Sequence, residues 1–269
     1  MNPSLRARLL LALPAVLALG ACVGPQPGGS LARMERPVSE LPVGKDEARG
    51  KAKVHVELGQ AYFQVGRYGV ALDEAKAAIS YDSRYAPAYQ LMGLVHMFLE
   101  ENQIADANFS YALSLAPGDP EIQNSYGWFL CSTGKEAAGI EMLQAAARNP
   151  YYQTPTRAQA NVGLCQLRLN NDTAAERAFL RAVELDNGNH QAVFHLAGIA
   201  YRRGAYEAAK RYVGAFNQAV EPTAESLWLA IRIERRLGDR AAEASLVQQL
   251  RRRFPGSPEY QAFLQGQYQ

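Results

Sequence analysis

The chain beyond residue 51 alternates between apolar stretches with a helical period and short breaks of turn residues. Apolar side chains in residues 52–65 recur at three- and four-residue steps, the turn Gly66-Arg67-Tyr68 follows, and a second periodic stretch runs to about Tyr81. This spacing places the apolar side chains on one face of a helix, and glycine or proline ends the helix. The pattern therefore predicts pairs of short helices joined by tight turns.

The helix pairs recur with a period of about 34 residues. Three columns of small residues keep the same steps of 34, 34 and then 36 along the chain: Gly59, Gly93, Gly127, Gly163 and Ala197; Ala71, Ala105, Gly139, Ala175 and Ala209; and Ala78, Ala112, Ala146 and Ala182. Small residues where helices cross let the two backbones approach closely, and large neighbours such as Phe109 fill the space beside them. We therefore expect six repeats, at 52–85, 86–119, 120–153, 156–189, 190–223 and 224–257, followed by a capping helix at 258–269.

The second repeat shows most clearly which repeat family the pattern resembles. It carries, in order, Tyr89, Met92, Gly93, Ala105, Phe109, Ala112 and Pro117, which is similar to the tetratricopeptide repeat. The resemblance implies an all-α fold, a right-handed superhelical solenoid of about six antiparallel helix pairs. The sixth repeat is degenerate, with Ile231 and Glu243 at small-residue positions, as an end repeat can be.

The N-terminus has the form of a bacterial export signal. Arg6 and Arg8 precede a run of eleven residues, 9–19, which is too short to span a bilayer of about 30 Å. The tetrapeptide Leu19-Gly20-Ala21-Cys22 resembles the lipobox of bacterial lipoproteins, in which the cysteine becomes the acylated N-terminus. We expect a signal peptide at 1–21, lipidation at Cys22 and a flexible Pro- and Gly-rich tether at 22–51. By the same resemblance, Val23 in place of an aspartate favours the periplasmic face of the outer membrane.

Composition and candidate chemistry argue against catalysis and nucleic-acid binding. Without Arg6 and Arg8 of the leader, the chain has 26 basic and 26 acidic residues, and a phosphate-binding surface needs a clustered basic excess. The four histidines, His55, His96, His190 and His195, lack metal-ligand spacing, and no Gly-x-Ser-x-Gly element or Gly-rich phosphate loop occurs. The sequence thus predicts a protein-binding function with no catalytic residue, metal, cofactor or small-molecule substrate.

The first helices of the repeats supply the expected binding surface. In tetratricopeptide repeats, positions 2, 5, 9, 12 and 13 face the concave side, and apolar and aromatic residues there are typical anchors for a helical or extended peptide. The alternative is that superhelical curvature buries these residues as ordinary core. The first three repeats are favoured because their aromatic residues cluster. The principal groove residues are Val56, Gln60, Phe63, Gln90, Leu94, Met97, Phe98, Asn124 and Trp128, and the same register includes Leu164, Leu167, Phe194, Tyr201, Trp228 and Arg232.

The two remaining cysteines fall on neighbouring first helices. Cys131 is at position 12 of the third repeat and Cys165 at position 10 of the fourth. Packed helices bring Cα atoms close to the separation that a disulfide needs, and the expected compartment permits disulfides. The alternative is two buried free thiols, since free cysteine is commonly buried.

Four segments resemble one particular lipoprotein family, the type IV pilus biogenesis and stability lipoproteins, or PilF/PilW pilotin family. They are Asn-Ser-Tyr-Gly-Trp-Phe-Leu-Cys at 124–131, Asn-Val-Gly-Leu-Cys at 161–165, Pro150-Tyr151-Tyr152, and the insertion Thr154-Pro155. The resemblance implies an outer-membrane pilotin that binds a secretin subunit and promotes its localisation and multimerisation. The alternative is an envelope scaffold lipoprotein that docks peptidoglycan-processing or outer-membrane assembly proteins.

Overall fold

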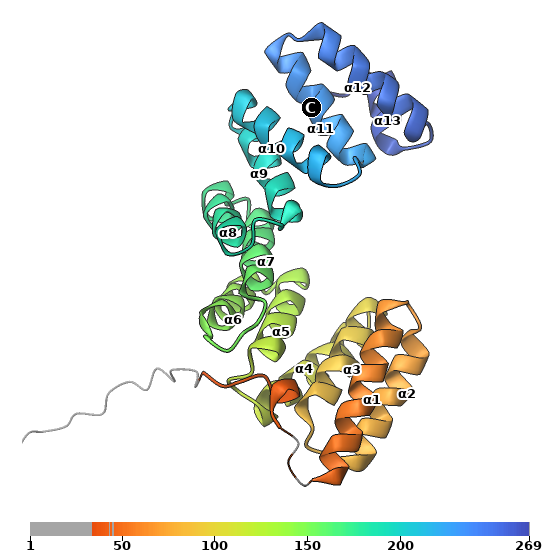
Figure 1. Cartoon of the computed structure of the whole chain (residues 1–269), viewed down its shortest axis with the longest axis vertical. Coiled ribbons are helices and arrows are strands. Elements are labelled where there is room, and N and C mark those ends of the chain that lie inside the picture. The colour runs from red at the N-terminus through yellow and green to blue at the C-terminus, as the bar shows by residue number, and fades with distance from the viewer. Residues whose placement is uncertain (1–33, 43, 45, 269) are drawn as a thin grey trace, which may run out of the picture. The chain divides into compact units, whose positions relative to one another are not determined.

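The computed structural model of the protein describes residues 34–42, 44 and 46–268, and within them every regular element is a helix (Figure 1). No strand occurs in this part of the chain, which confirms the all-α prediction. The expected signal peptide at 1–21 and the lipidation residue Cys22 lie outside the described residues.

Twelve of the helices form six consecutive hairpins. The pairs are α1 (Glu47–Gln64) with α2 (Tyr68–Tyr81), α3 (Ala86–Phe98) with α4 (Asn102–Leu115), α5 (Pro120–Ser132) with α6 (Glu136–Arg148), α7 (Pro155–Arg168) with α8 (Asp172–Leu185), α9 (His190–Arg202) with α10 (Tyr206–Ala219), and α11 (Ala224–Leu237) with α12 (Arg240–Arg253). One hairpin thus falls in each expected repeat. Two helices start earlier than expected, α1 at Glu47 rather than residue 52 and α7 at Pro155.

Side-chain caps and prolines explain where several helices begin. Asp119 accepts hydrogen bonds from the amides of Glu121 and Ile122 at the start of α5, where Pro120 occupies the first turn. Asp46 does the same for α1 by accepting from the Arg49 amide at 3.2 Å. The Asp46 cap therefore explains the early start of α1, since it satisfies a helix N-terminus ahead of the first apolar position.

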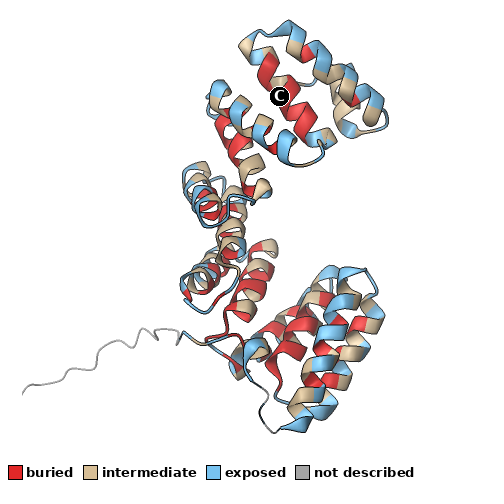
Figure 2. Ribbon diagram, in the orientation of Figure 1, coloured by how far each residue is buried: buried red, intermediate tan, exposed pale blue. Residues whose placement is uncertain are grey.

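The columns of small residues lie where the two helices of a hairpin cross. A Cβ atom added to Gly163 would come within 2.6 Å of the Phe179 ring, and one added to Gly127 within 2.9 Å of the Gly139 carbonyl oxygen. Each second helix also packs on the first helix of the next repeat, and the first helices α1, α3, α5 and α7 contact one another in turn, as do α9 and α11. The buried residues follow these contact faces (Figure 2). The result is a tetratricopeptide-repeat solenoid.

The end of the last hairpin is covered by α13 (Pro258–Leu264) and the residues after it. Tyr260, Phe263 and Tyr268 pack against the cluster around Trp228 and Leu250. Glu243, which stands at a small-residue position, is buried and pairs with Arg235 at 2.8 Å and Arg240 at 3.0 Å. The degenerate sixth repeat is thus stabilised by ion pairs and a capping helix.

The segment before α1 differs from the flexible tether expected at 22–51. Residues 38–40 form a 3-10 helix, η1 (Val38–Glu40), and the Val38 amide donates to Asp119 Oδ2 at 2.6 Å. Pro37 is buried, and Val38 packs against α3 and its surroundings. The difference arises because the chain doubles back onto the turn between the second and third hairpins, which local composition does not reveal.

Candidate protein-binding surface

The row of first helices buries three of the nine principal groove residues. Val56 lies in the core with Tyr85 and Ala88. The Gln90 side-chain amide donates to the Glu121 carbonyl oxygen at 3.0 Å and to Ser125 Oγ at 2.9 Å, and Asn124 Oδ1 accepts from Asn161 Nδ2 at 3.1 Å. These side chains join adjacent repeats and are not accessible to a partner, because position 5 of each first helix faces the first helix of its neighbour.

The other six groove residues retain exposed surface. Gln60 is exposed, Phe63, Leu94, Met97 and Trp128 are half-buried, and Phe98 is 55% exposed. Leu94 and Met97 pack on the cluster around Phe109 and Phe129, whereas Trp128 packs on the cluster that contains the two cysteines. Apart from Gln60, the accessible groove residues of the first three repeats are therefore apolar.

Three rings from the first two repeats form a cluster that we name the aromatic patch. Phe63 contacts Phe98 edge to face at a centroid distance of 5.0 Å, and Tyr68 lies 5.6 Å from Phe63 and 5.9 Å from Phe98. The adjoining turns and helix starts expose Val65, Leu99 and Ile104. Tyr68 was not predicted as a site residue, although it closes the turn Gly66-Arg67-Tyr68 and could have been found as the first residue of the second helix.

A second accessible region, the C-terminal pocket, lies in repeats that the sequence did not favour. It is a cavity of about 270 Å³ lined by Leu167 of α7, Phe194, His195, Gly198 and Arg202 of α9, Glu225, Trp228, Leu229 and Arg232 of α11, and Glu259 of α13. Leu167, Phe194, Trp228 and Arg232 are expected groove positions. Gly198 occupies position 9, where the other first helices carry a side chain, and a Cβ atom there would meet only Arg202, at 3.6 Å. The missing side chain of Gly198 therefore opens the pocket.

Aromatic rings and burial set the electrostatics of the C-terminal pocket. The Arg232 guanidinium lies over the Tyr201 ring at 5.0 Å and over the Trp228 ring at 5.7 Å, and burial lowers its pKa. His195 stacks on Phe179 at 5.0 Å, and burial, with a smaller contribution from Arg202, lowers the pKa of its imidazole. Arg202 pairs with Asp172 at 2.6 Å, and this hydrogen bond lowers the pKa of the Asp172 carboxyl. The pocket thus presents apolar surface beside charges of both signs.

The two cysteines meet between the third and fourth repeats. Cys131 of α5 and Cys165 of α7 are fully buried with their Cα atoms 5.8 Å apart, and the structure pairs them in a disulfide. The pair lies beneath Trp128 in the groove row. A bond here would fasten the repeats that carry the apolar groove to those that carry the C-terminal pocket.

The histidines occupy separate structural positions. His55 Nδ1 lies 2.6 Å from Glu74 Oε2, and His96 Nδ1 lies 2.5 Å from Glu101 Oε2. Within the described part of the chain, no group of three His, Cys, Asp or Glu side chains could hold a metal ion, and no helix is long and apolar enough to cross a membrane.

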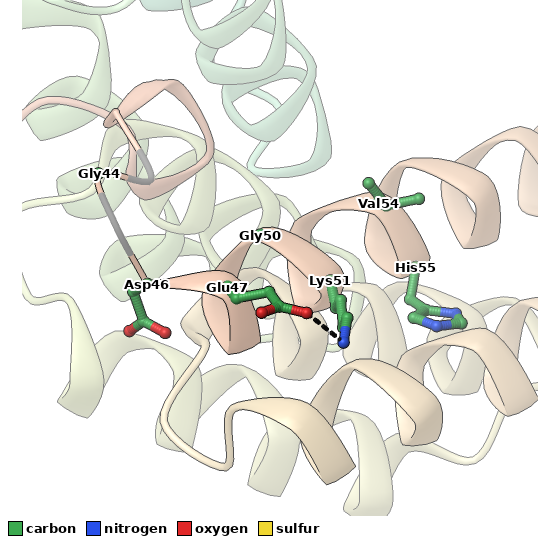
Figure 3. A pocket seen from close by; sticks show the side chains of 7 residues that line it. All are labelled: Gly44, Asp46, Glu47, Gly50, Lys51, Val54 and His55. Carbon is green, nitrogen blue, oxygen red and sulfur yellow. Dashed lines mark ion pairs between the residues drawn. The ribbon is translucent and has the colours of Figure 1, made fainter.

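A further hollow, of about 580 Å³, lies at the start of α1 and includes Gly44 and Asp46 before the helix (Figure 3). Figure 3 shows Glu47 and Lys51 pointing toward one another, with Lys51 Nζ 2.7 Å from Glu47 Oε1. Its lining comes from one helix and the residues preceding it. We assign it no ligand, because its charged groups pair along the helix surface.

Comparisons with known proteins match most of the chain, although no family model matches it. The chain is 29% identical over 220 residues to the type IV pilus assembly protein PilF of Pseudomonas aeruginosa, covering 82% of this chain and 86% of that protein. The solved structure of Pseudomonas aeruginosa PilF superimposes with a TM-score of 0.74 and covers 83% of this chain and 99% of that one. The crystal structure of PilW, a widely conserved type IV pilus biogenesis factor, has the same TM-score at 28% identity and covers 79% of this chain and 98% of PilW.

Proposed function

Because this chain belongs to the tetratricopeptide-repeat family of type IV pilus biogenesis proteins, we propose that it is an outer-membrane pilotin that binds a secretin subunit. The aromatic patch is the observation that carries the choice of surface. Phe98 is 55% exposed while it contacts two other rings, so a partner would bury a preassembled apolar anchor. Preassembled aromatic residues lose little conformational freedom on binding, which is why they are frequent hot spots.

The role requires binding and tethering but no chemical step. Acyl chains on Cys22 would hold the protein at the membrane, and several chains give stable attachment where one gives only marginal binding. Attachment raises the local concentration of the bound secretin subunit at that membrane, which favours multimerisation there. Binding also covers apolar surface of the subunit before assembly.

The aromatic patch is tested with the double variant Phe63→Ala and Phe98→Ala in the full chain. Truncation of two central anchors should weaken copurification of the secretin at least about tenfold and reduce its multimers. Leu185→Ala is the matched control, because Leu185 is a similarly exposed apolar residue at the end of a second helix. Normal multimers and normal copurification in the double variant would refute the proposed binding surface.

The anchor and the identity of the partner need separate measurements. The mass of the mature N-terminus should show an acylated Cys22, and Cys22→Ser should leave the protein outside the outer-membrane fraction. A pull-down that recovers peptidoglycan-processing or outer-membrane assembly proteins, and no secretin, would favour the scaffold alternative over the pilotin role.

A further inference from the structure

The solenoid contains a built binding site at the turns that follow its second and third hairpins. Two buried polar side chains meet there, Asp119 with 1% of its surface exposed and Asn149 with 4%. Asp119 Oδ1 caps α5 by accepting from the amides of Glu121 at 2.9 Å and Ile122 at 3.1 Å. The other oxygen, Oδ2, points away from the cap and can accept a further donor.

The chain's own residues 35–40, which we name the clasp segment, occupy this site through their backbone. The Val38 amide donates to Asp119 Oδ2 at 2.6 Å, and Asn149 Nδ2 donates to the Glu35 carbonyl oxygen at 2.8 Å. Asn149 Nδ2 also donates to the Gly118 carbonyl oxygen at 3.2 Å, and the Glu35 amide approaches that oxygen at 3.4 Å. Hydrogen bonds to the backbone fix the position of this segment, whatever its side chains.

Side chains of the clasp segment complete the fit. Val38 packs between two apolar clusters, one containing Ala86 and Ile122 and the other containing Tyr85. The Arg36 guanidinium lies 5.0 Å from the centre of the Tyr151 ring. The site thus combines an apolar hole, an aromatic face and two buried hydrogen-bonding groups from three different repeats.

The clasp segment supplies a hydrogen bond that offsets part of the free-energy cost of burying the Asp119 carboxylate. Burial raises the pKa of this carboxyl, and the hydrogen bonds from Val38, Ile122 and Glu121 act in the opposite direction. Removal of the Val38 amide would deprive a buried carboxylate of one of its three donors, which is costly in a site with little access to water.

We propose that residues 35–40 are a clasp that fixes the point where the membrane tether leaves the solenoid and shortens the free part of that tether. The effect on the tether rests on the proposed lipidation of Cys22, whereas the clasp itself does not. With the clasp closed, the thirteen residues 22–34 reach at most about 45 Å, whereas the 24 residues 22–45 would reach about 80 Å. The clasp therefore roughly halves the length of chain that could separate a lipidated Cys22 from the junction of the second and third repeats.

Hydrogen exchange on the purified full chain tests the clasp without lipid or secretin. Val38→Pro removes the amide donor, and the preceding Pro37 already has ψ 131°, which suits the residue before a proline. Asn149→Ala removes the second anchor, and Leu41→Ala is the control at an exposed neighbouring residue. Amides of the peptide 34–42 should exchange at least about tenfold faster in Val38→Pro and Asn149→Ala than in the control, as expected for loss of a hydrogen bond to a buried group.

Exchange of this peptide at the unstructured rate in the unsubstituted chain, or no change in either variant, would overturn the clasp. Its effect on the tether is read from energy transfer between a dye at Gln153→Cys and an acceptor lipid, with the acylated chain in vesicles. Transfer should fall in Val38→Pro, and unchanged transfer would overturn the shortening. A chain that fails to bind secretin but keeps its protected peptide would refute the pilotin role and leave the clasp standing.

Discussion

At the level of single residues, one backbone conformation recurs in every hairpin turn. A residue one or two positions after the end of each first helix adopts a positive φ, from 55° to 85°, at Gly66, Glu100, Gly134, Asn170, Gly204 and Gly238. These positions keep the repeat steps of 34 and 36. A side chain destabilises this left-handed conformation, less for asparagine than for other residues, so Glu100 is the least suited of the six.

Glu100→Gly should therefore stabilise the protein. Glycine removes the strain of the left-handed conformation, which stabilises the folded chain, but it also has more conformational freedom in the unfolded chain, which offsets part of that gain. The net effect should raise the free energy of unfolding by about 0.5–1 kcal/mol. Urea denaturation measures it. Gly134→Ala, at the equivalent turn with φ 85°, should shift the midpoint in the opposite direction. A lower urea midpoint for Glu100→Gly would contradict this account.

His195 should make stability depend on pH. Its pKa is lowered in the folded state, so its contribution is present above the unfolded pKa of about 6.5 and is lost as pH falls below that value. His195→Phe keeps a ring to stack on Phe179 and removes the titration. Urea midpoints measured from pH 7.5 to 5 should fall more steeply for the unsubstituted chain than for His195→Phe, and parallel curves would contradict the assignment.

At the level of helices, one contact between neighbouring repeats changes its chemistry along the solenoid. It joins the last turn of a first helix to the start of the preceding second helix, and its pairs are Phe98 with Tyr68, Arg168 with Glu136, Arg202 with Asp172, and Arg236 with Tyr206. The contact is aromatic between the first and second repeats, and it is an ion pair between the third and fourth and between the fourth and fifth repeats. This explains why the aromatic patch lies in the first two repeats.

Gly163 and Gly198 stand at adjacent positions of their repeats, and substitution by alanine should change the stability of the protein in opposite directions at the two sites. Gly163→Ala places a methyl carbon 2.6 Å from the Phe179 ring, which is closer than van der Waals contact allows, and should lower the free energy of unfolding by about 1–3 kcal/mol. Gly198→Ala meets only Arg202, at 3.6 Å, and should stabilise α9 by about 1 kcal/mol because alanine is the better helix former. Thermal unfolding of the two variants compares them, and equal shifts of one sign would refute the packing argument.

At the level of the whole solenoid, the pairing of Cys131 with Cys165 links halves with different surfaces. A bond closing this loop, with a sequence separation of 34, should stabilise the fold by about 3–4 kcal/mol through the unfolded chain. Reductant should lower the melting temperature of the unsubstituted chain and not that of a Cys131→Ala, Cys165→Ala variant. Because both cysteines are buried, thiols must be counted after denaturation, and two alkylated thiols without reductant would show that no bond forms.

The sequence alone determined the helices, their pairing into hairpins and the position of each repeat. These features depend on contacts within each hairpin, such as Gly163 with Phe179 and Gly127 with Gly139, and the same small residues recur at each repeat where the two helices cross. Tyr68 escaped notice as a site residue because its role comes from Phe98 in the next repeat. The family resemblance was also local, since it rested on short segments such as 124–131 and 161–165.

Only the tertiary structure decided which groove positions are accessible and where the N-terminal segment binds. Val56, Gln90 and Asn124 all stand at position 5 of their repeats and are buried, whereas Phe98 at position 13 is exposed. The sequence pattern marks all of these positions as apolar or groove-facing, and only the packing of adjacent first helices shows that position 5 is covered by the neighbouring repeat. The Val38–Asp119 contact joins residues 81 apart, and the contact of Asn149 with Glu35 joins residues 114 apart. No periodicity signals such contacts, because they form once and depend on the completed stack of helices.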